Sequence, residues 1–391
     1  MSEQNQGPGG PISRRRFLRN LAVAGGSAAV PLGVSSVAQA FTLGAPSAFT
    51  LGAPSHLRVG LAMPAFGKDG AQTASLVQGL RLALAGAPDV TFADAAPGTA
   101  MEQVAALGRA GADLVIGAVT PHGARHVGAA LRGSRTVFLN VEPGAQILRP
   151  RDYHAWVFHH TLNLWQANYA AGVQAASARG RRAAILSSYI ESGYDTSAAF
   201  TAGFESSGGT VVGLAVSHVP GQTATLPQLV SELHAAGADF IYVNASGERA
   251  AELLAAVGPN AVAAPFAQSG LADTPFANAY LKVAGAAPDA YALLGYEAGN
   301  LVLAAASSAQ TRGSSLAAAL REARFTGPRG SIHMQAGSHA TCAGRYVDAG
   351  GAALKHLPEI AEAQALAHVG WPLAVSGWTL PYGASFKIRR A

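Results

Sequence analysis

The sequence predicts an α/β fold with two Rossmann-like lobes, in which parallel sheets flanked by helices are joined by a hinge of three crossing segments. The first observation is the alternation of strand and helix patterns between Trp156 and Gly213. Within it, Asn163–Ala178 carries apolar residues at helical spacing, and Arg182–Ser187 is the short apolar run typical of a buried parallel strand. The second observation is length, because 391 residues exceed what one hydrophobic core usually supports.

The same alternation precedes this stretch and predicts the first lobe. Pro64 ends the opening strand, and the helix after it carries leucines on one stripe. The expected strands are Leu57–Met63, Val90–Ala93, Asp113–Gly117 and Thr136–Asn140, with helices between them. Parallel strands joined in this way place their carboxyl ends at one edge of the sheet, where ligands of α/β proteins bind.

The second lobe is expected to continue through alternating elements up to Phe266. They are the helix Leu226–Ala236, the strand Asp239–Val243, the helix Arg249–Val257 and the strand Val262–Phe266. Gln268–Gly270 then suits a return crossing, and the helix Tyr291–Ala305 and the Gly-framed turn Gly327–Gly330 follow. We therefore expect lobe 1 to comprise residues 56–150 and 270–330, and lobe 2 to comprise residues 151–269 and 331–391.

The N-terminal 40 residues read as an export signal. Ser13–Arg19 matches the twin-arginine pattern, a weakly apolar Gly/Ala-rich segment follows, and Ala38–Ala40 has the small-x-small form of a cleavage site. This predicts export by the twin-arginine translocase and a soluble periplasmic protein, with no Cys near the cleavage site for a lipid anchor. Residues 41–55 are expected to be a flexible leader, because Ala40–Ser47 repeats exactly as Ala48–Ser55.

Composition excludes several classes of function. Residues 1–40 hold four Arg and one Glu, so they account for +3 of the net charge of +5. The remainder has no Lys/Arg run, and we expect no nucleic-acid partner. Cys342 is the only cysteine, which rules out an intrachain disulfide and a cysteine-based metal site.

Several short pieces, in order along residues 56–350, are similar to one protein family. They are Leu57–Met63 before a Pro, Asp113–Gly117, Val157-Phe158, Gly193 ahead of Phe200, Ala287–Tyr291 with Gly295-Tyr296, and Phe325–Gly327 before Gly330. Together they resemble the type I periplasmic binding proteins of the leucine/isoleucine/valine-binding family, the solute receptors of ABC importers. The resemblance implies a small-molecule ligand in a cleft between two lobes, and a membrane permease as partner.

The resemblance also places candidate ligand-binding residues at the ends of strands. In the first lobe they are Thr120, His122, Asn140 and Glu142. In the second lobe they are His159, Ser192, Tyr194 and Glu248, the last aligned with the family's acid for a ligand ammonium group. Pro121 and Glu142 replace residues that are often Ser or another small hydroxyl residue in relatives, which argues against simple transfer of leucine recognition. Amino acids, amides, urea-like compounds, aromatic acids and apolar molecules all remain open as ligands.

Other chemistry has weaker support in the sequence. His122 and His126 lie four residues apart, but no third ligand is fixed, and we predict no metal and no cofactor. The sequence has no G-x-S-x-G, H-E-x-x-H, P-loop or G-x-G-x-x-G motif, so we do not expect an enzyme. The alternatives to an import receptor are a ligand sensor for a separate signalling protein and an exported hydrolase with a dispersed site.

Overall fold

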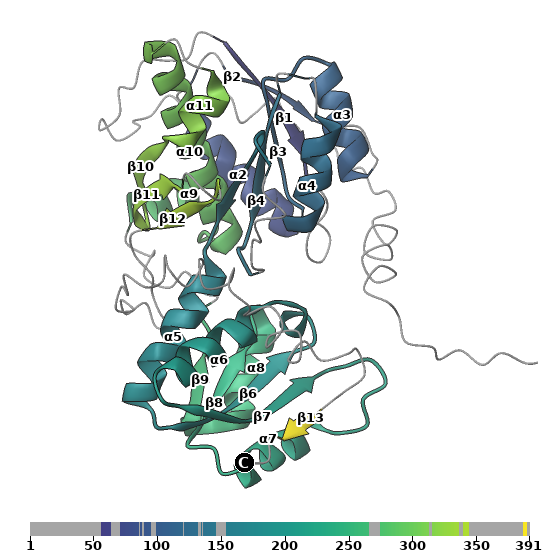
Figure 1. Ribbon diagram of the computed structural model, residues 1–391, viewed down its shortest axis with the longest axis vertical. Coiled ribbons are helices and arrows are strands. Elements are labelled where there is room, and N and C mark those ends of the chain that lie inside the picture. The colour runs from purple at the N-terminus through teal and green to yellow at the C-terminus, as the bar shows by residue number, and fades with distance from the viewer. Residues whose placement is uncertain are drawn as a thin grey trace, which may run out of the picture.

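Two parallel sheets, each covered by helices on both faces, form two lobes, as the sequence predicts (Figure 1). The structure is a computed structural model. It describes residues 56–63, 71–85, 87, 90–94, 99–119, 121–131, 134, 136–145, 154–265, 274–312, 315–335, 339–343 and 386–388.

The first lobe is built on a parallel sheet with the strand order β2-β1-β3-β4-β5. Its strands are β1 (Leu57–Ala62), β2 (Val90–Asp94), β3 (Leu114–Gly117), β4 (Val137–Glu142) and β5 (Val157–Thr161). Its helices are α2 (Ala71–Leu84), α3 (Ala100–Arg109), α4 (Pro121–Ala130), α9 (Pro275–Ala284), α10 (Ala290–Arg312) and α11 (Leu316–Arg321). Alternate residues of β4 serve the two faces: Leu139 joins the core under α2 and α10, and Phe138 joins the core under α3 and α4.

The second lobe has a sheet in the order β13-β7-β6-β8-β9. Its strands are β6 (Arg182–Ser188), β7 (Thr210–Ser217), β8 (Phe240–Asn244), β9 (Ala261–Ala263) and β13 (Phe386–Ile388), and only β13 is antiparallel to its neighbour. Its helices are α5 (Leu164–Ala178), α6 (Thr196–Ser206), α7 (Leu226–Ala235) and α8 (Gly247–Val257), with short 3₁₀ turns at η4 (Glu191–Gly193) and η5 (Gly258–Asn260). Phe200 of α6 stacks on Tyr242 of β8 in the core beneath α5 and α6.

The boundary between the lobes differs from the expected one. We placed residues 151–269 in the second lobe, but β5 pairs with β4 in the sheet of the first lobe, and the chain crosses only after Thr161. Residues 331–343 also differ from expectation, because β10 (Arg324–Gly327), β11 (Gly330–Met334) and β12 (Thr341–Ala343) form a small antiparallel sheet beside α10 and β5. An apolar run does not reveal which sheet a strand joins, because both sheets bury the same residue types.

The ends of the chain remain expectations from the sequence. The predicted signal, the repeated leader and most of the segment after Ala343 lie outside the described residues. Three residues near the C-terminus are described, and they extend the second sheet at β7 (Figure 1). Among the described helices, none is long and apolar enough to cross a membrane.

The close contact between α2 and α10 gives a test of the first lobe's packing. A Cβ added at Gly295 would lie 1.9 Å from the carbonyl oxygen of Leu76, so the two helices would have to separate. We expect Gly295→Ala to destabilise the protein by about 1–3 kcal/mol in urea denaturation, because overpacking outweighs the gain in helix propensity of up to about 1 kcal/mol. Gly193→Ala is the control, since nothing lies within 4 Å of its added Cβ. Equal stability of the two variants would contradict this packing.

Candidate ligand-binding site between the lobes

The carboxyl ends of β4 and β6 meet where the two lobes touch. The backbone N–H of Asp195, which follows the loop after β6, donates a hydrogen bond of 3.0 Å to the carbonyl oxygen of Ala145 after β4. The N–H of Trp165, at the start of α5, donates one of 2.8 Å to the carbonyl of Gly144. These bonds bring groups from both lobes to one place, which is where open parallel sheets bind ligands.

Glu142 is the first-lobe acid at this junction. It is the last residue of β4, its side chain is partly buried, and its Oε2 accepts a hydrogen bond of 2.8 Å from the N–H of Gly144. Burial raises the pKa of Glu142 from 4.5 to about 7, against the opposing effect of that hydrogen bond. At neutral pH this carboxyl group can therefore either accept a hydrogen bond as an anion or donate one as an acid.

Glu191 is the second-lobe acid, and it lies in the loop between β6 and α6. The residue is 4% exposed, and its carboxylate accepts hydrogen bonds from the hydroxyls of Ser188 and Ser246. The side-chain amide nitrogen of Asn244 lies 3.5 Å from the backbone carbonyl oxygen of Glu191. The ends of β6 and β8 thus hold this acid in a fixed position at the junction.

Two tyrosines stand close to both acids. Tyr194 follows η4 in the second lobe but packs against the core of the first, and Tyr291 is the second residue of α10. Burial raises the pKa of Tyr194 to about 12, with smaller contributions from Glu191 and Glu142. The pKa of Tyr291 is also raised, first by burial and then by Tyr194, Asp289, Glu191 and Glu142. The charged groups acting on these phenols are carboxylates, so the electrostatic environment favours ligand atoms that donate hydrogen bonds.

Asn140 and His159 come together, but their hydrogen bonds join strands within the first lobe. Asn140 is fully buried; its amide accepts from the N–H of Val119 at 2.9 Å and donates to the carbonyl of the same residue at 3.0 Å. The amide nitrogen also lies 3.2 Å from Nδ1 of His159. Burial, with a smaller contribution from His339, lowers the pKa of His159 to about 3, so this imidazole is neutral. These contacts use the amide of Asn140 and Nδ1 of His159, whereas the buried Nε2 of His159 has no hydrogen-bond partner within the described part of the chain.

Ser192 lies in η4 beside Glu191, and Glu248 lies in α8. Ser192 is partly exposed and its hydroxyl donates to the carbonyl of Tyr189 at 2.7 Å. Glu248 is exposed in the first turn of α8, where the helix dipole favours an acid without any ligand. His122 lies in α4 but its side chain is outside the described part of the chain, as is all of Thr120.

Glu191 and Tyr291 were not predicted as site residues. The loop that contains Glu191 has the correct position, at the carboxyl end of a buried strand, but its side chain could not be distinguished from a solvated acid. Tyr291 lies 97 residues after Tyr194 in the chain, and no local pattern joins them. Among the residues that the structure describes, no group of three His, Cys, Asp or Glu side chains could hold a metal ion.

The raised pKa of Glu142 predicts how stability depends on pH. The folded protein keeps this proton where the unfolded chain has lost it, so ionisation of Glu142 costs stability as pH rises from about 4.5 to about 7. We expect Glu142→Gln to be more stable than the native protein at pH 8, by on the order of 1–3 kcal/mol, and to lose this advantage near pH 4. Urea denaturation at both pH values measures it. The control is Glu248→Gln, an exposed acid, and a similar pH profile for both variants would contradict the burial of Glu142.

Comparison with known proteins agrees with this architecture. The sequence pattern of the periplasmic binding protein family matches residues 57–274. No curated protein matches the chain significantly. Among solved structures, a solute-binding protein of an ABC transporter from Rhodopseudomonas palustris BisB5, in complex with 3,4-dihydroxybenzoic acid, has a TM-score of 0.60 at 18% identity. The match covers 76% of this chain and 95% of that one.

A second similar structure is the closed conformation of a leucine-, isoleucine-, valine-, threonine- and alanine-binding protein from Brucella ovis. It has a TM-score of 0.58 at 19% identity, covering 73% of this chain and 87% of that one. An ABC transporter substrate-binding protein from Sphaerobacter thermophilus also has a TM-score of 0.58 at 19% identity, with coverage of 76% and 95%. At these identities the structures support the fold, and the family pattern spans more than half of the sequence. The chain therefore belongs to the periplasmic binding protein family.

Proposed function

We propose that this protein is the solute-binding receptor of an ABC importer, and that it captures a small molecule between its two lobes. The observation that carries the proposal is the hydrogen bond of 3.0 Å from the N–H of Asp195 to the carbonyl of Ala145, which joins the second-lobe loop containing Glu191 and Tyr194 to the segment after Glu142. Structures with the same fold include ABC substrate-binding proteins, which supports a membrane permease as the partner. We expect capture without chemical turnover.

Closure of the lobes needs no reaction. A ligand that touches groups from both lobes binds the closed arrangement more tightly, and so it shifts the population of lobe arrangements toward closure. The permease can then distinguish loaded from empty receptor by the shape of the closed form.

The ligand class follows from the groups at the junction. Glu142, Glu191 and the phenols of Tyr194 and Tyr291 suit a ligand with ammonium, amide or hydroxyl hydrogens. Because the pKa of Glu142 is about 7, its protonated form can also donate to a carboxylate oxygen. We therefore propose an amino acid, an amide or a related compound. Similar structures carry leucine in one case and 3,4-dihydroxybenzoic acid in another, so the fold itself accommodates different ligands.

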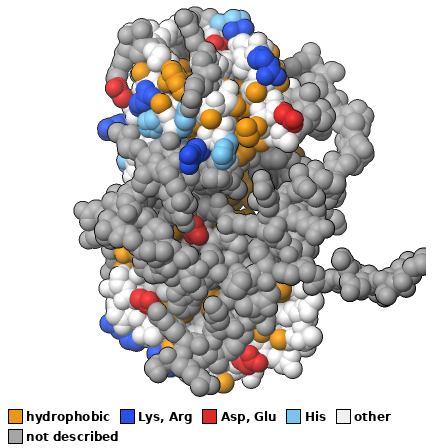
Figure 2. Space-filling view, turned by 45° about the vertical axis from the view of Figure 1, so that its right-hand side comes forward, with side chains coloured by type: hydrophobic (Ala, Val, Ile, Leu, Met, Phe, Trp, Pro, Cys, Tyr) orange, Lys and Arg blue, Asp and Glu red, His pale blue; other side chains and the backbone are white. Residues whose placement is uncertain are grey.

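The site of action is proposed from the sequence. The twin-arginine pattern at Ser13–Arg19 supports export by the twin-arginine translocase into the periplasm, without a lipid anchor. The net charge of +5 lies largely in that segment. On the face drawn in Figure 2, described acidic and basic side chains are interspersed over both lobes, which gives no support for a nucleic-acid surface.

Ligand retained by gently purified protein tests the function. We expect mass spectrometry to identify a small molecule at about one per protein chain, and solution scattering to show compaction when it is added back to stripped protein. The ligand should be recovered unchanged after incubation. Conversion of the ligand would favour the hydrolase alternative, and failure of a broad metabolite screen to change shape or melting temperature would contradict the receptor.

Substitutions then test the site. We expect Tyr194→Phe and Glu142→Gln each to weaken binding of the identified ligand by about 5- to 150-fold, since each removes a desolvated hydrogen bond worth about 1–3 kcal/mol. Glu248→Gln, at an exposed position, is the control and should leave affinity unchanged. Calorimetry measures all three. A loss confined to Glu248→Gln would move the site away from the junction.

The pH dependence of affinity shows whether the ligand donates a hydrogen bond to Glu142 or accepts one from it. If the ligand donates to ionised Glu142, affinity should increase as pH rises through about 7, and protons should be released on binding. A ligand carboxylate held by protonated Glu142 should give the opposite slope. Calorimetry in buffers of different ionisation enthalpy counts the protons, and Glu142→Gln should abolish the dependence. A native slope that persists in this variant would exclude Glu142 as its source.

A further inference from the structure

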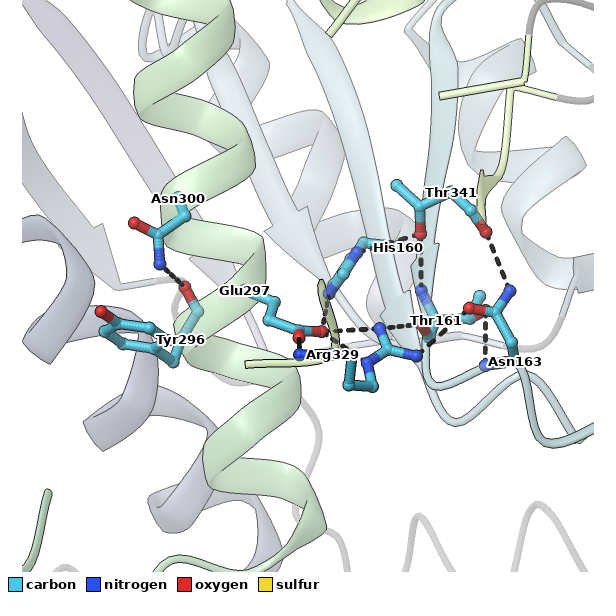
Figure 3. Close-up of polar contacts among 8 residues, drawn as sticks. All are labelled: His160, Thr161, Asn163, Tyr296, Glu297, Asn300, Arg329 and Thr341. Atoms are coloured by element: carbon cyan, nitrogen blue, oxygen red, sulfur yellow. Dashed lines mark hydrogen bonds and ion pairs between the residues drawn. The ribbon is translucent and has the colours of Figure 1, made fainter. Parts of the chain in front are cut away.

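A buried polar cluster surrounds the point where the chain leaves the first lobe. The crossing runs from the end of β5 to the start of α5, and Asn163 lies between them, 1% exposed. Figure 3 shows the side chains that converge there, from β5, β12, α10 and the turn between β10 and β11. The members of this crossing cluster are His160, Thr161, Asn163, Glu297, Arg329 and Thr341.

Asn163 has a backbone conformation that the surrounding contacts must maintain. Its φ of 55° and ψ of 39° lie in the left-handed region, which costs energy for a residue other than glycine, although Asn tolerates it better than most. Its N–H donates to Oγ1 of Thr161 at 3.1 Å, and its Nδ2 donates to the carbonyl of Thr341 at 2.9 Å. Its Oδ1 accepts from Arg329 Nη1 at 3.2 Å. The side chain is thus bonded to two segments of the first lobe.

Arg329 links this crossing to the body of the first lobe. Its Nη2 donates to the carbonyl of Thr161 at 2.8 Å, and its Nε and Nη2 donate to Oε2 of Glu297 at 2.8 and 2.6 Å. Arg329 is 6% exposed and Glu297 is fully buried in α10. One rigid guanidinium therefore contacts the residue before the crossing, the residue at its turn, and a long helix of the first lobe.

His160 and Thr341 complete the cluster. Nε2 of His160 lies 3.6 Å from Oε2 of Glu297, and its Nδ1 lies 3.0 Å from the hydroxyl of Thr341. Burial, and then the charge of Arg329, hold the pKa of His160 well below its ordinary value, so this imidazole is neutral and Arg329 alone balances Glu297.

Such a pair is a costly way to fill a core. Removing two charges from water carries a desolvation penalty that their attraction often fails to exceed, and apolar residues of similar volume can stabilise a fold at least as well. A buried pair is therefore weak evidence for a role in stability alone, and its place beside the crossing suggests a role in geometry.

We propose that Arg329, oriented by Glu297, is a positioning residue that sets the direction in which the chain crosses from the first lobe to the second. Any rotation between the lobes at this segment must change the backbone dihedral angles near Asn163. Arg329 is hydrogen-bonded there to the carbonyl of Thr161 and to the side chain of Asn163. The cluster would restrict the open arrangements available before a ligand binds. This deepens the proposed receptor function, but its test needs no ligand.

The test measures the distance between the lobes in ligand-stripped protein. Cysteines are placed at Met101, exposed in α3, and Ser231, exposed in α7, with the buried Cys342 replaced by Ala. Single-molecule energy transfer between dyes at these positions gives the distribution of lobe separations. It is recorded well below the melting temperature of each variant.

Three variants probe the cluster. Arg329→Lys keeps the positive charge but loses the planar guanidinium and its several N–H donors. Glu297→Gln keeps the shape of the side chain but loses its negative charge. Asn163→Gly removes the side-chain hydrogen bonds, and glycine readily adopts the left-handed conformation. Leu301→Ala is the matched control, because it opens a cavity in the core of the first lobe, on the same helix as Glu297.

We expect the distribution of lobe separations to be broader in the three cluster variants, with a shifted mean. In the control Leu301→Ala we expect a lower melting temperature but a native distribution of lobe separations. A purely structural role would overturn the proposal, and it would appear as lowered melting temperatures with native distributions in all the variants. If Arg329→Lys and Glu297→Gln fail to fold, Asn163→Gly decides alone, because it leaves the ion pair intact. A native distribution in that variant overturns the proposal, yet leaves the proposed receptor function standing.

Discussion

The convergence of strand ends at the boundary between the lobes is the constraint on which the candidate site depends. β4 and β6 belong to different sheets, yet the segments that follow them are joined by the hydrogen bond from Asp195 to Ala145. Parallel strands direct their carboxyl ends to one edge of each sheet, so facing two such edges toward each other gathers loop residues from both lobes. This arrangement brings the loop of Glu191 and Tyr194 to the end of β4, where Glu142 lies.

Three buried or partly buried glutamates show how environment decides what an acid does. Glu297 is matched by the guanidinium of Arg329, and Glu191 by the hydroxyls of Ser188 and Ser246. Glu142 has one backbone N–H, and its pKa is raised to about 7. Glu297 and Glu191 have side-chain partners within the protein, whereas the only hydrogen bond to the Glu142 carboxyl among the described residues comes from the backbone. Glu142 therefore has the fewest interactions to offset the loss of hydration on burial. A ligand with hydrogens to donate would supply what Glu142 lacks.

The crossing between the lobes is bonded to the first lobe. Helices α2 and α10 approach so closely that Gly295 has no room for a methyl group, and the small sheet of β10 to β12 adds the turn that carries Arg329. The crossing after β5 is therefore attached to the first lobe, while α5 beyond it packs on α6 in the second. We expect movement between the lobes at this crossing to concentrate in the few residues between β5 and α5.

The sequence by itself determined the fold class, most of the helices and strands, and the family. Apolar runs such as Ala183–Leu186 and glycines at helix ends are local signals, because they determine secondary structure through residues close by in the sequence. They could not assign β5 to its sheet, because burial on both faces makes parallel strands alike. They indicated the loop after β6 as a place for function, but did not select Glu191 within it.

Tertiary structure decided which polar side chains have partners within the protein. Asn140 and His159 have the residue types of a binding site, but buried contacts occupy the Asn140 amide and one ring nitrogen of His159. Glu248 has the same chemistry as Glu142 but lies exposed on a helix. Tyr194 and Tyr291, and likewise Asn163 and Arg329, are far apart in sequence and adjacent in space. Only folding brings such pairs together, because their partners come from distant parts of the chain and no local pattern joins them.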